Sequence, residues 1–248
     1  MNLYKMFFFE KRYMYYFFIT LMIVIFVYAI ICFLRPRKLN DKFYDYKKIY
    51  PILENINTNE TLLEIHDNLA NSEWIDWPEK HLYQNEHIDG TWKIIPFFGF
   101  DVWCKKSCFK FPKLTKFLKS IPDLKVALIS KLSSKTKLFP HYGWGAHSNN
   151  VLRCHYGIVL PLDKSNSYIS VSNDETSSEE IQFHKLNDWI VFDDSKLHYA
   201  ENKSDDERIV LIIDIKRPDY IKKGTSSVEE TSELLEVVNK MKALNETN

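Results

Sequence analysis

The residues best suited to chemistry lie between residues 130 and 208. His141 stands at the end of one predicted strand, and His198 follows the turn-forming residues 193–195 after another. Arg208, ten residues beyond His198, opens an apolar run that ends at Ile215. Imidazole is a suitable ligand for Fe(II), and a guanidinium binds a carboxylate through two parallel hydrogen bonds. Two histidines on separate strands with an inward arginine therefore indicate a metal site that also takes a dicarboxylate co-substrate.

A second pair of such residues, Arg153 and His155, lies inside an apolar segment. Side chains alternate between the two faces of a strand, so Arg153, His155 and Gly157 share one face. An arginine and a histidine that face a barrel interior are costly without a partner, and a buried anionic ligand would remove that cost. We interpret the remaining histidines outside the loop at 144–150, taken singly, as surface or satisfied core residues: His66, His81, His87 and His184.

These residues need a scaffold of several short strands. Five apolar or alternating runs are separated by turn residues, a spacing typical of a β-sandwich or a jelly-roll barrel. The runs are Lys125–Ile129, Arg153–Leu160, Tyr168–Val171, Trp189–Phe192 and Arg208–Ile215. Helices are predicted over Thr61–Leu69, Pro112–Leu118 and Thr231–Leu244.

One segment ahead of the strands is apolar without interruption. Residues 13–34 are 22 consecutive residues without a charge. As a helix they would extend about 33 Å, enough to cross the hydrocarbon core of a bilayer. A signal peptide would end in a small-residue cleavage site, and a core helix would show a polar face; this segment has neither. We therefore predict one transmembrane signal-anchor, whose orientation stays open because basic residues flank it on both sides.

Composition limits the function classes. The chain has 248 residues, enough for one or two domains with a real core. Lys and Arg together number 33, as do Asp and Glu, so the basic excess typical of nucleic-acid-binding proteins is missing and we expect no nucleic-acid partner. Four Cys are too few for a disulfide scaffold, and no CxxC pair suggests structural zinc.

Taken in order, the motifs resemble the aspartyl/asparaginyl β-hydroxylase family of Fe(II)/2-oxoglutarate oxygenases. They are PHYGWGAHSNNVLRCHYGIVLP, WIVFDDSKLH and RIVLIIDIKRPD, preceded by CFKFPKLTKFLKSIP and by Thr91-Trp92-Lys93. The resemblance covers roughly residues 90–220, about half the chain. It implies a mainly β fold, a double-stranded β-helix (a jelly-roll or cupin-like barrel) with flanking helices. Members of the family commonly carry an N-terminal membrane anchor, in agreement with the predicted transmembrane helix.

The resemblance also implies roles for individual residues. His141 matches the first iron-binding histidine, in the motif P-H-x-G, and His198 matches the second, at the end of F-D-D-S-x-x-H. Arg208 matches the arginine that holds the distal carboxylate of 2-oxoglutarate, and Ser130 matches a serine that assists it. The two residues that match a pair near the other carboxylate of the co-substrate are Arg153 and His155.

Three features depart from common patterns. Most iron oxygenases of this class add a carboxylate two residues after the first histidine. That position is Gly143, as is normal in this family, where water fills the coordination site. The loop at 144–150 is longer than in the family and is expected to line the substrate entrance, with His147 as a candidate extra ligand. Whether Cys104 and Cys108 form a bridge stays open.

The chain divides into five predicted parts. These are an N-terminal tail (1–12), the transmembrane anchor (13–34), a polar Lys/Asn-rich stem (35–89), the oxygenase-like domain (90–220) and a C-terminal helical tail (221–248). The stem would lift the catalytic site off the bilayer, which favours a soluble or protein substrate over a lipid.

The resemblance implies a membrane-anchored dioxygenase that uses Fe(II), 2-oxoglutarate and O2. Its predicted reaction is hydroxylation of the β-carbon of Asp or Asn side chains in a peptide or protein, such as an EGF-like domain. Two alternatives stay open: hydroxylation of a lipid acyl chain by the same chemistry, and a catalytically inactive barrel that serves as an interaction module. The expected location is a membrane, which the chain crosses once. A type II arrangement in the endoplasmic reticulum is one option that the open orientation allows, and the oligomeric state is also open.

Overall fold

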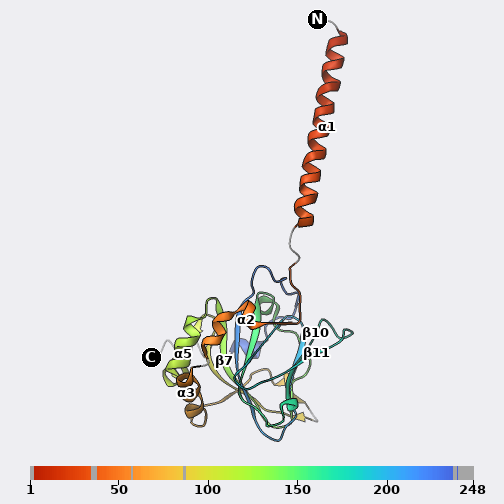
Figure 1. The fold of residues 1–248 in the computed structure, drawn as a ribbon. Coiled ribbons are helices and arrows are strands. Elements are labelled where there is room, and N and C mark those ends of the chain that lie inside the picture. The colour runs from red at the N-terminus through yellow and green to blue at the C-terminus, as the bar shows by residue number, and fades with distance from the viewer. Residues whose placement is uncertain (1–2, 35–37, 57, 86–87, 237–238, 240–248) are drawn as a thin grey trace. The chain divides into compact units, whose positions relative to one another are not determined.

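The chain folds into two compact units, Met1–Leu39 and Asn40–Asn248. The computed structural model describes residues 3–34, 38–56, 58–85, 88–236 and 239. The first unit contains one helix, α1 (Leu3–Leu34), drawn in red in Figure 1. Its side chains from Tyr13 to Tyr28 are all exposed. Among the described residues, no helical stretch has the length and apolar character that a bilayer crossing requires, so the predicted anchor at 13–34 is not confirmed.

The second unit is built around two antiparallel sheets. The larger sheet has the strand order β1-β12-β9-β14-β7-β5-β2, with β6 paired to β5, and the smaller has the order β11-β10-β13-β8. The strands of the larger sheet are β1 (Phe43–Tyr44), β2 (Ile75–Asp76), β5 (Trp92–Gly99), β6 (Val102–Trp103), β7 (Leu124–Leu132), β9 (Val151–Val159), β12 (Trp189–Phe192) and β14 (Arg208–Lys216). Those of the smaller are β8 (Thr136–Lys137), β10 (Ser167–Ser172), β11 (Glu180–Phe183) and β13 (Leu197–Asn202). A separate hairpin pairs β3 (Gln84–Asn85) with β4 (Ile88–Asp89).

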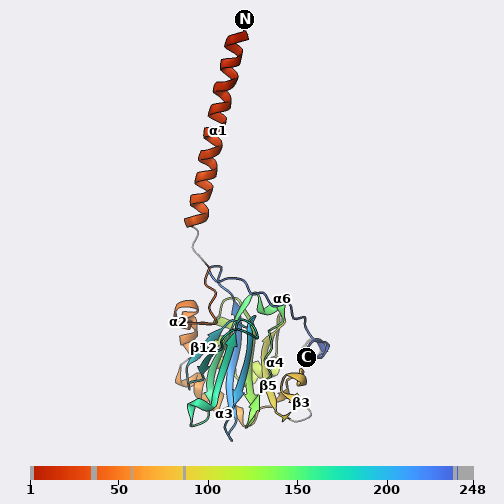
Figure 2. The same ribbon diagram turned by 90° about the vertical axis from the view of Figure 1, so that its right-hand side faces the viewer.

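The connectivity identifies the barrel. From β7 to β14 the chain passes back and forth between the sheets: β7, β9, β12 and β14 belong to the larger, and β8, β10, β11 and β13 to the smaller. Eight antiparallel strands shared in this way between two sheets form a jelly roll, the double-stranded β-helix. Figure 2 shows the long strands of the larger sheet side by side, between β12 and β5. The predicted mainly β fold is confirmed, and all five predicted strand runs overlap observed strands.

Period-two alternation divides the larger sheet into two faces. On β14, Leu211 and Ile213 pack into an outer core, whereas Val210 and Ile212 pack into a second core inside the barrel. Helices cover the outer face: α3 (Asn59–Leu69), α4 (Lys105–Lys110) and α5 (Pro112–Ser120). On β9, Cys154 belongs to the outer core, so its neighbours Arg153 and His155 face inward, as the alternation predicts.

The predicted stem is wrong for residues 40–89, which are part of the barrel unit. Strand β1 extends the larger sheet next to β12, and the short helix α2 (Tyr46–Ile49) and the 3-10 helix η1 (Pro51–Ile56) follow. Leu53, Ile56 and Ile65 are completely buried in the outer core. These apolar side chains would be exposed in a free stem, and their burial favours packing on the sheet. The predicted domain boundary at residue 90 is therefore too late.

The two remaining sequence predictions concern the C-terminal helix and the cysteines. Residues 232–236 are helical, and half of the predicted helix Thr231–Leu244 lies outside the described residues. Cys104 and Cys108 are free thiols, as is the buried Cys154. The bridge that the sequence left open is therefore not formed.

Candidate active site

His141 and His198 meet inside the barrel through a pair of backbone hydrogen bonds. The His141 N–H donates to the His198 carbonyl at 3.0 Å, and the His198 N–H donates back at 2.9 Å. His198 lies on β13, and His141 lies in the segment between β8 and the short helix α6 (Gly145–Ser148). The two imidazole rings have centroids 4.4 Å apart. The backbone pairing thus brings together the two predicted metal ligands.

Both imidazoles are set up to offer Nε2 to a metal. Each Nδ1 lies at a backbone carbonyl: His141 at 2.7 Å from the oxygen of Phe139, and His198 at 2.8 Å from that of Lys196. A carbonyl only accepts, so Nδ1 carries the proton and Nε2 keeps its lone pair. Burial is the main cause that lowers the pKa of His141 to about 3 and that of His198 to about 4, so both are neutral near pH 7. A neutral imidazole fixed in this tautomer fits a metal ligand.

Asp194 brings a carboxylate to the same place. Its Oδ1 lies 3.2 Å from His198 Nε2. Two buried atoms that both present lone pairs repel each other, and a cation bound beside them would turn this contact into an attraction. Among the described residues, no group of three or more His, Cys, Asp or Glu side chains has metal-binding geometry. The donor set is therefore two histidines with one carboxylate close by.

The position of Asp194 explains why residue 143 is a glycine. A β-carbon at position 143 would overlap the Asp194 carboxylate and would also lie 2.7 Å from the Ser148 β-carbon. The space that the missing triad carboxylate would need is filled by a carboxylate from another segment. An acidic side chain at 143 would therefore not fit without displacing Asp194.

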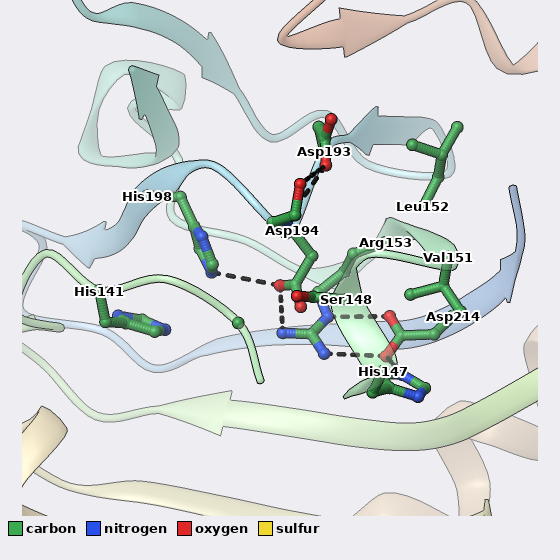
Figure 3. Close-up of polar contacts among 12 residues, drawn as sticks. His141, His147, Ser148, Val151, Leu152, Arg153, Asp193, Asp194, His198 and Asp214 are labelled. Carbon is green, nitrogen blue, oxygen red and sulfur yellow. Dashed lines mark hydrogen bonds and ion pairs between the residues drawn. The ribbon is translucent and has the colours of Figure 1, made fainter. Parts of the chain in front are cut away.

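Arg153 is bonded to two carboxylates of the chain (Figure 3). Its Nε and Nη2 donate to Asp214 at 2.9 and 2.8 Å, and its Nη1 lies 2.6 Å from Asp194. Burial alone would lower the pKa of Arg153, but the two carboxylates outweigh burial and raise it. Its charge is thus neutralised within the chain, and the structure gives no support for a further carboxylate on Arg153. His147 is no metal ligand: its Nε2 lies 2.7 Å from Asp214.

Arg208 is the opposite case. It is only 1% exposed, and its Nε and Nη1 have no hydrogen-bond partner among the described residues. The acids just before it are exposed, and two of them pair elsewhere: Glu207 with Lys131 at 2.9 Å, and Asp205 with Lys135 at 3.1 Å. Burial lowers the pKa of Arg208 to about 9. A buried, unpaired guanidinium fits an anionic ligand that enters the barrel.

Two histidines lie close to Arg208. His155 Nδ1 is 3.2 Å from His184 Nε2, and His184 Nδ1 is 2.9 Å from the Ser167 hydroxyl. His155 Nε2 is buried without a partner among the described residues. Burial, with a contribution from Arg208, lowers the pKa of both histidines well below its usual value. The sequence predicted His155 but treated His184 as an ordinary residue, since no motif marks it.

Ser130, the last predicted site residue, lies in this part of the barrel. Its backbone on β7 is directly opposite Val210 on β14. The Ser130 hydroxyl accepts a hydrogen bond of 3.0 Å from the Trp92 indole. Its own hydrogen stays available for a ligand, because an indole N–H is only a donor.

Comparison with known proteins agrees with this arrangement. A model of the family described as "Aspartyl/Asparaginyl beta-hydroxylase" matches residues 57–218. The chain belongs to this family. The match begins ahead of the predicted boundary at residue 90, as the packing of the stem also requires.

Individual relatives are more distant. A curated ornithine lipid ester-linked acyl 2-hydroxylase of Rhizobium tropici is 29% identical over 130 residues, which are 52% of this chain and 43% of that protein. The chain thus matches less than half the length of this relative. A 2OG-Fe(II) oxygenase family oxidoreductase from Burkholderia pseudomallei has 10% identity and a TM-score of 0.44, with 69% of this chain and 83% of that chain covered. A Pseudomonas putida prolyl-4-hydroxylase has 8% identity and a TM-score of 0.42, with 68% and 87% covered.

Three stacked indoles line the cavity that contains His141. The rings of Trp77 and Trp92 have centroids 4.5 Å apart, and Trp144 lies 6.0 Å from Trp77 on its other side. Buried Glu79 accepts from the indole nitrogens of Trp77 and Trp144, both at 3.2 Å, and from the Thr231 hydroxyl at 2.9 Å. No sequence pattern predicts this arrangement, because Trp144 and Thr231 come from segments far from Trp77 and Glu79 in the chain.

Two adjoining cavities share these indoles and Arg153. One, of about 230 Å³, contains His141 and Asp194. The other, of about 70 Å³, is almost entirely apolar and lies against residues of the paired strands β5 and β7. Its remaining lining residues include Ile94, Pro96, Phe98, Phe100, Leu128, Ile212 and Leu234. Arg153, already paired, is the only lysine or arginine among the described residues that line the two cavities.

Proposed function

We propose that the chain is a hydroxylase that depends on Fe(II), 2-oxoglutarate and O2. The observation that carries this proposal is the pairing of two features in one barrel: two neutral histidines with unprotonated Nε2 atoms, and a buried Arg208 without a counter-charge among the described residues. A metal alone would not account for Arg208. A dicarboxylate that reaches from the metal to the guanidinium would satisfy both.

Each residue then has a defined task. His141 and His198 would hold the iron, which when bound supplies the activation of O2 for hydroxylation of a C–H bond. Arg208 and the Ser130 hydroxyl would hold the distal carboxylate of 2-oxoglutarate, and His155 Nε2, buried without a partner among the described residues, would contribute. Arg153 holds Asp194 beside His198, and the three indoles form an apolar wall of the cavity that contains His141.

For the substrate, we propose an apolar acyl chain. The apolar cavity next to His141 suits hydrocarbon, and the relative from Rhizobium tropici is named for acyl hydroxylation. A substrate carboxylate would meet Asp194 and would find Arg153 already neutralised by two carboxylates. The packed stem also removes the argument that the site stands well away from a bilayer.

Hydroxylation of Asp or Asn in a peptide, such as an EGF-like domain, is the second candidate. It is supported by the description of the family to which the chain belongs. The inactive-barrel alternative is disfavoured, because a barrel without a ligand would have no use for an unpaired Arg208.

Membrane attachment through residues 13–34 belongs to the same proposal. It is supported by the absence of charge in this run and by the exposed apolar side chains between Tyr13 and Tyr28. Exposed apolar surface of this extent calls for a lipid or protein cover. An anchor would hold the catalytic unit at a membrane, where acyl lipids are present. Alkaline extraction of membranes from expressing cells tests it: the full chain should stay in the pellet, and release would contradict the attachment.

The test of the function uses the full chain with Fe(II), 2-oxoglutarate and two substrate sets, short-chain acyl lipids and EGF-like peptides. We expect succinate formation coupled to a hydroxylated acyl chain. In parallel, titration with Co(II) monitors metal binding without turnover, and His141→Ala or His198→Ala should weaken it at least about 100-fold. Metal binding that survives either substitution would contradict the site. Coupled product from the peptides alone would reverse the choice of substrate.

A further inference from the structure

A polar cavity of about 500 Å³ lies beside the active site. It shares Tyr142 and Val228 with the cavity that contains His141. Three lysines line it, Lys196, Lys222 and Lys223, and the other lining groups are mostly amides and hydroxyls. They include Asn40, Asn173, Ser195, Thr225, Ser226 and Ser227. None of these residues has a task in the proposed hydroxylation.

The positive charge in this cavity is not compensated. Lys196 is only 9% exposed, and its Nζ contacts two neutral amide oxygens, that of Asn173 at 2.7 Å and that of Asn40 at 3.4 Å. Lys222 and Lys223 are exposed, and neither has an ion-pair partner among the described residues.

The carboxylate in the lining is already engaged. Asp193 accepts from both Nη atoms of Arg217, at 2.8 and 2.5 Å, and from the Ser195 hydroxyl at 2.6 Å. Arg217 is buried and neutralises Asp193. Three lysines therefore line the cavity without a counter-charge in the described part of the chain, which suits an anion of charge near −2.

The segment that carries two of the lysines is held in place. Asn149 exchanges two hydrogen bonds with the Ser226 backbone, at 2.8 and 2.9 Å, and the Ser226 hydroxyl donates to the Gly143 carbonyl at 2.5 Å. A side chain at Gly224 would overlap Ser195, so the segment lies tightly against the turn that precedes His198. The cavity is thus preformed, and its wall is bonded directly to the active-site loop.

We propose that the Lys196–Lys222–Lys223 cavity binds a phosphate group, and that this phosphate is the polar head of the substrate. The ammonium group of lysine binds phosphate as a point charge and does not need planar geometry. Because the two cavities meet at Tyr142 and Val228, one molecule would place its head among the lysines and its chain beside His141. The headgroup assignment rests on the proposed acyl hydroxylation; the phosphate site itself does not.

The test is isothermal titration of the full chain with inorganic phosphate and with dihexanoyl phosphatidic acid, a soluble lipid with a phosphate head. Lys222→Gln/Lys223→Gln should weaken the binding of both at least tenfold. These lysines are exposed, so the double variant is expected to fold, and an unchanged thermal midpoint checks this. The control is Lys125→Gln/Lys164→Gln, two exposed lysines elsewhere on the barrel unit, which should leave both affinities unchanged.

The outcomes separate the two levels of the inference. Tighter binding of the phosphatidic acid than of phosphate, lost with the lysines, supports a lipid head. Equal binding of both, lost with the lysines, supports a site for free phosphate and overturns the headgroup assignment. No binding, or binding that the double variant leaves intact, overturns the site. Failure of the proposed hydroxylase would show separately, as absence of succinate formation with every acyl substrate.

Discussion

Two inward-facing arginines on neighbouring strands, Arg153 on β9 and Arg208 on β14, have opposite surroundings. Arg153 is held by two carboxylates, and Asp214 is its direct partner in the strand register. Arg208 has no carboxylate partner, and Nε and Nη1 lack hydrogen-bond partners among the described residues. Arg208 is the more buried of the two, 1% exposed against 18% for the Arg153 side chain, so the arginine that most needs a partner is the one without a carboxylate.

This difference separates an arginine with a structural role, Arg153, from one that is available to bind a ligand, Arg208. A buried cation that is paired within the chain is a fixed part of the structure, and its removal leaves carboxylates without a counter-charge. A buried cation without a pair is costly until an anion arrives. We therefore propose that Arg208 binds the co-substrate and that Arg153 positions Asp194 next to His198.

The largest expected effect is on stability. Arg153→Met leaves Asp194 and Asp214 buried without their cation and should lower the free energy of unfolding by about 3–5 kcal/mol. Arg208→Met removes an unpaired charge from the ligand-free protein and should leave this free energy unchanged or raise it. Urea unfolding of the metal-free protein measures both. An equal decrease in the free energy of unfolding in the two variants would contradict the different roles of the two arginines.

The second prediction tests the position of Asp194, the carboxylate that Arg153 holds. Gly143→Ala introduces a β-carbon where the Asp194 carboxylate lies, and overpacking of this kind costs about 1–3 kcal/mol. We expect a similar loss in the free energy of unfolding, together with weaker Co(II) binding, because Asp194 must move from His198. Gly99→Ala is the matched control, since a β-carbon there has no neighbour within 4 Å. An undisturbed Gly143→Ala variant would mean that Asp194 is placed differently.

A smaller effect is expected when the proposed binding of 2-oxoglutarate by Arg208 is tested. Arg208→Lys keeps the charge but loses the two parallel hydrogen bonds, and should weaken 2-oxoglutarate binding about tenfold, which corresponds to about 1.4 kcal/mol. Co(II) affinity should stay as in the wild type. Competition with the N-oxalyl analogue of 2-oxoglutarate gives the first quantity, and titration the second. Unchanged co-substrate affinity would make Arg208 a structural residue.

The smallest effect concerns pH. Burial lowers the pKa of His184 well below its value in the unfolded chain, which is about 6.5. The unfolded chain therefore binds a proton below pH 6.5 that the folded protein does not, and stability falls as the pH falls. For one such histidine the loss between pH 6.5 and 5.5 is about 1 kcal/mol.

His184→Gln should remove this contribution from the pH dependence of urea unfolding, measured on the metal-free protein. His66→Gln, the same substitution at an exposed histidine on α3, serves as the control. A slope that His184→Gln leaves unchanged would mean that this histidine titrates normally in the folded protein.

Much of the site could be predicted from the sequence, because its main signals are local. Side-chain alternation on a strand has a period of two, so the apolar run around Arg153 and His155 already required both to share one face. The motifs that mark His141, His198 and Arg208 are likewise short, contiguous segments, so they can be found without knowledge of the fold. The number and spacing of the apolar runs limited the fold to a β-sandwich or a jelly-roll barrel, and the resemblance to the family implied the jelly roll.

The partners of these residues were decided only by the tertiary structure. Asp214 lies opposite Arg153 because β14 and β9 pair in one register, and that register depends on strands far apart in the chain. Asp194 fills the space beside Gly143 because a turn between β12 and β13 packs against the His141 segment. The same long-range packing placed residues 40–89 on the sheet and stacked Trp77 on Trp92. Local alternation fixes which face a side chain takes, whereas strand register and packing between distant segments fix which charge it meets there.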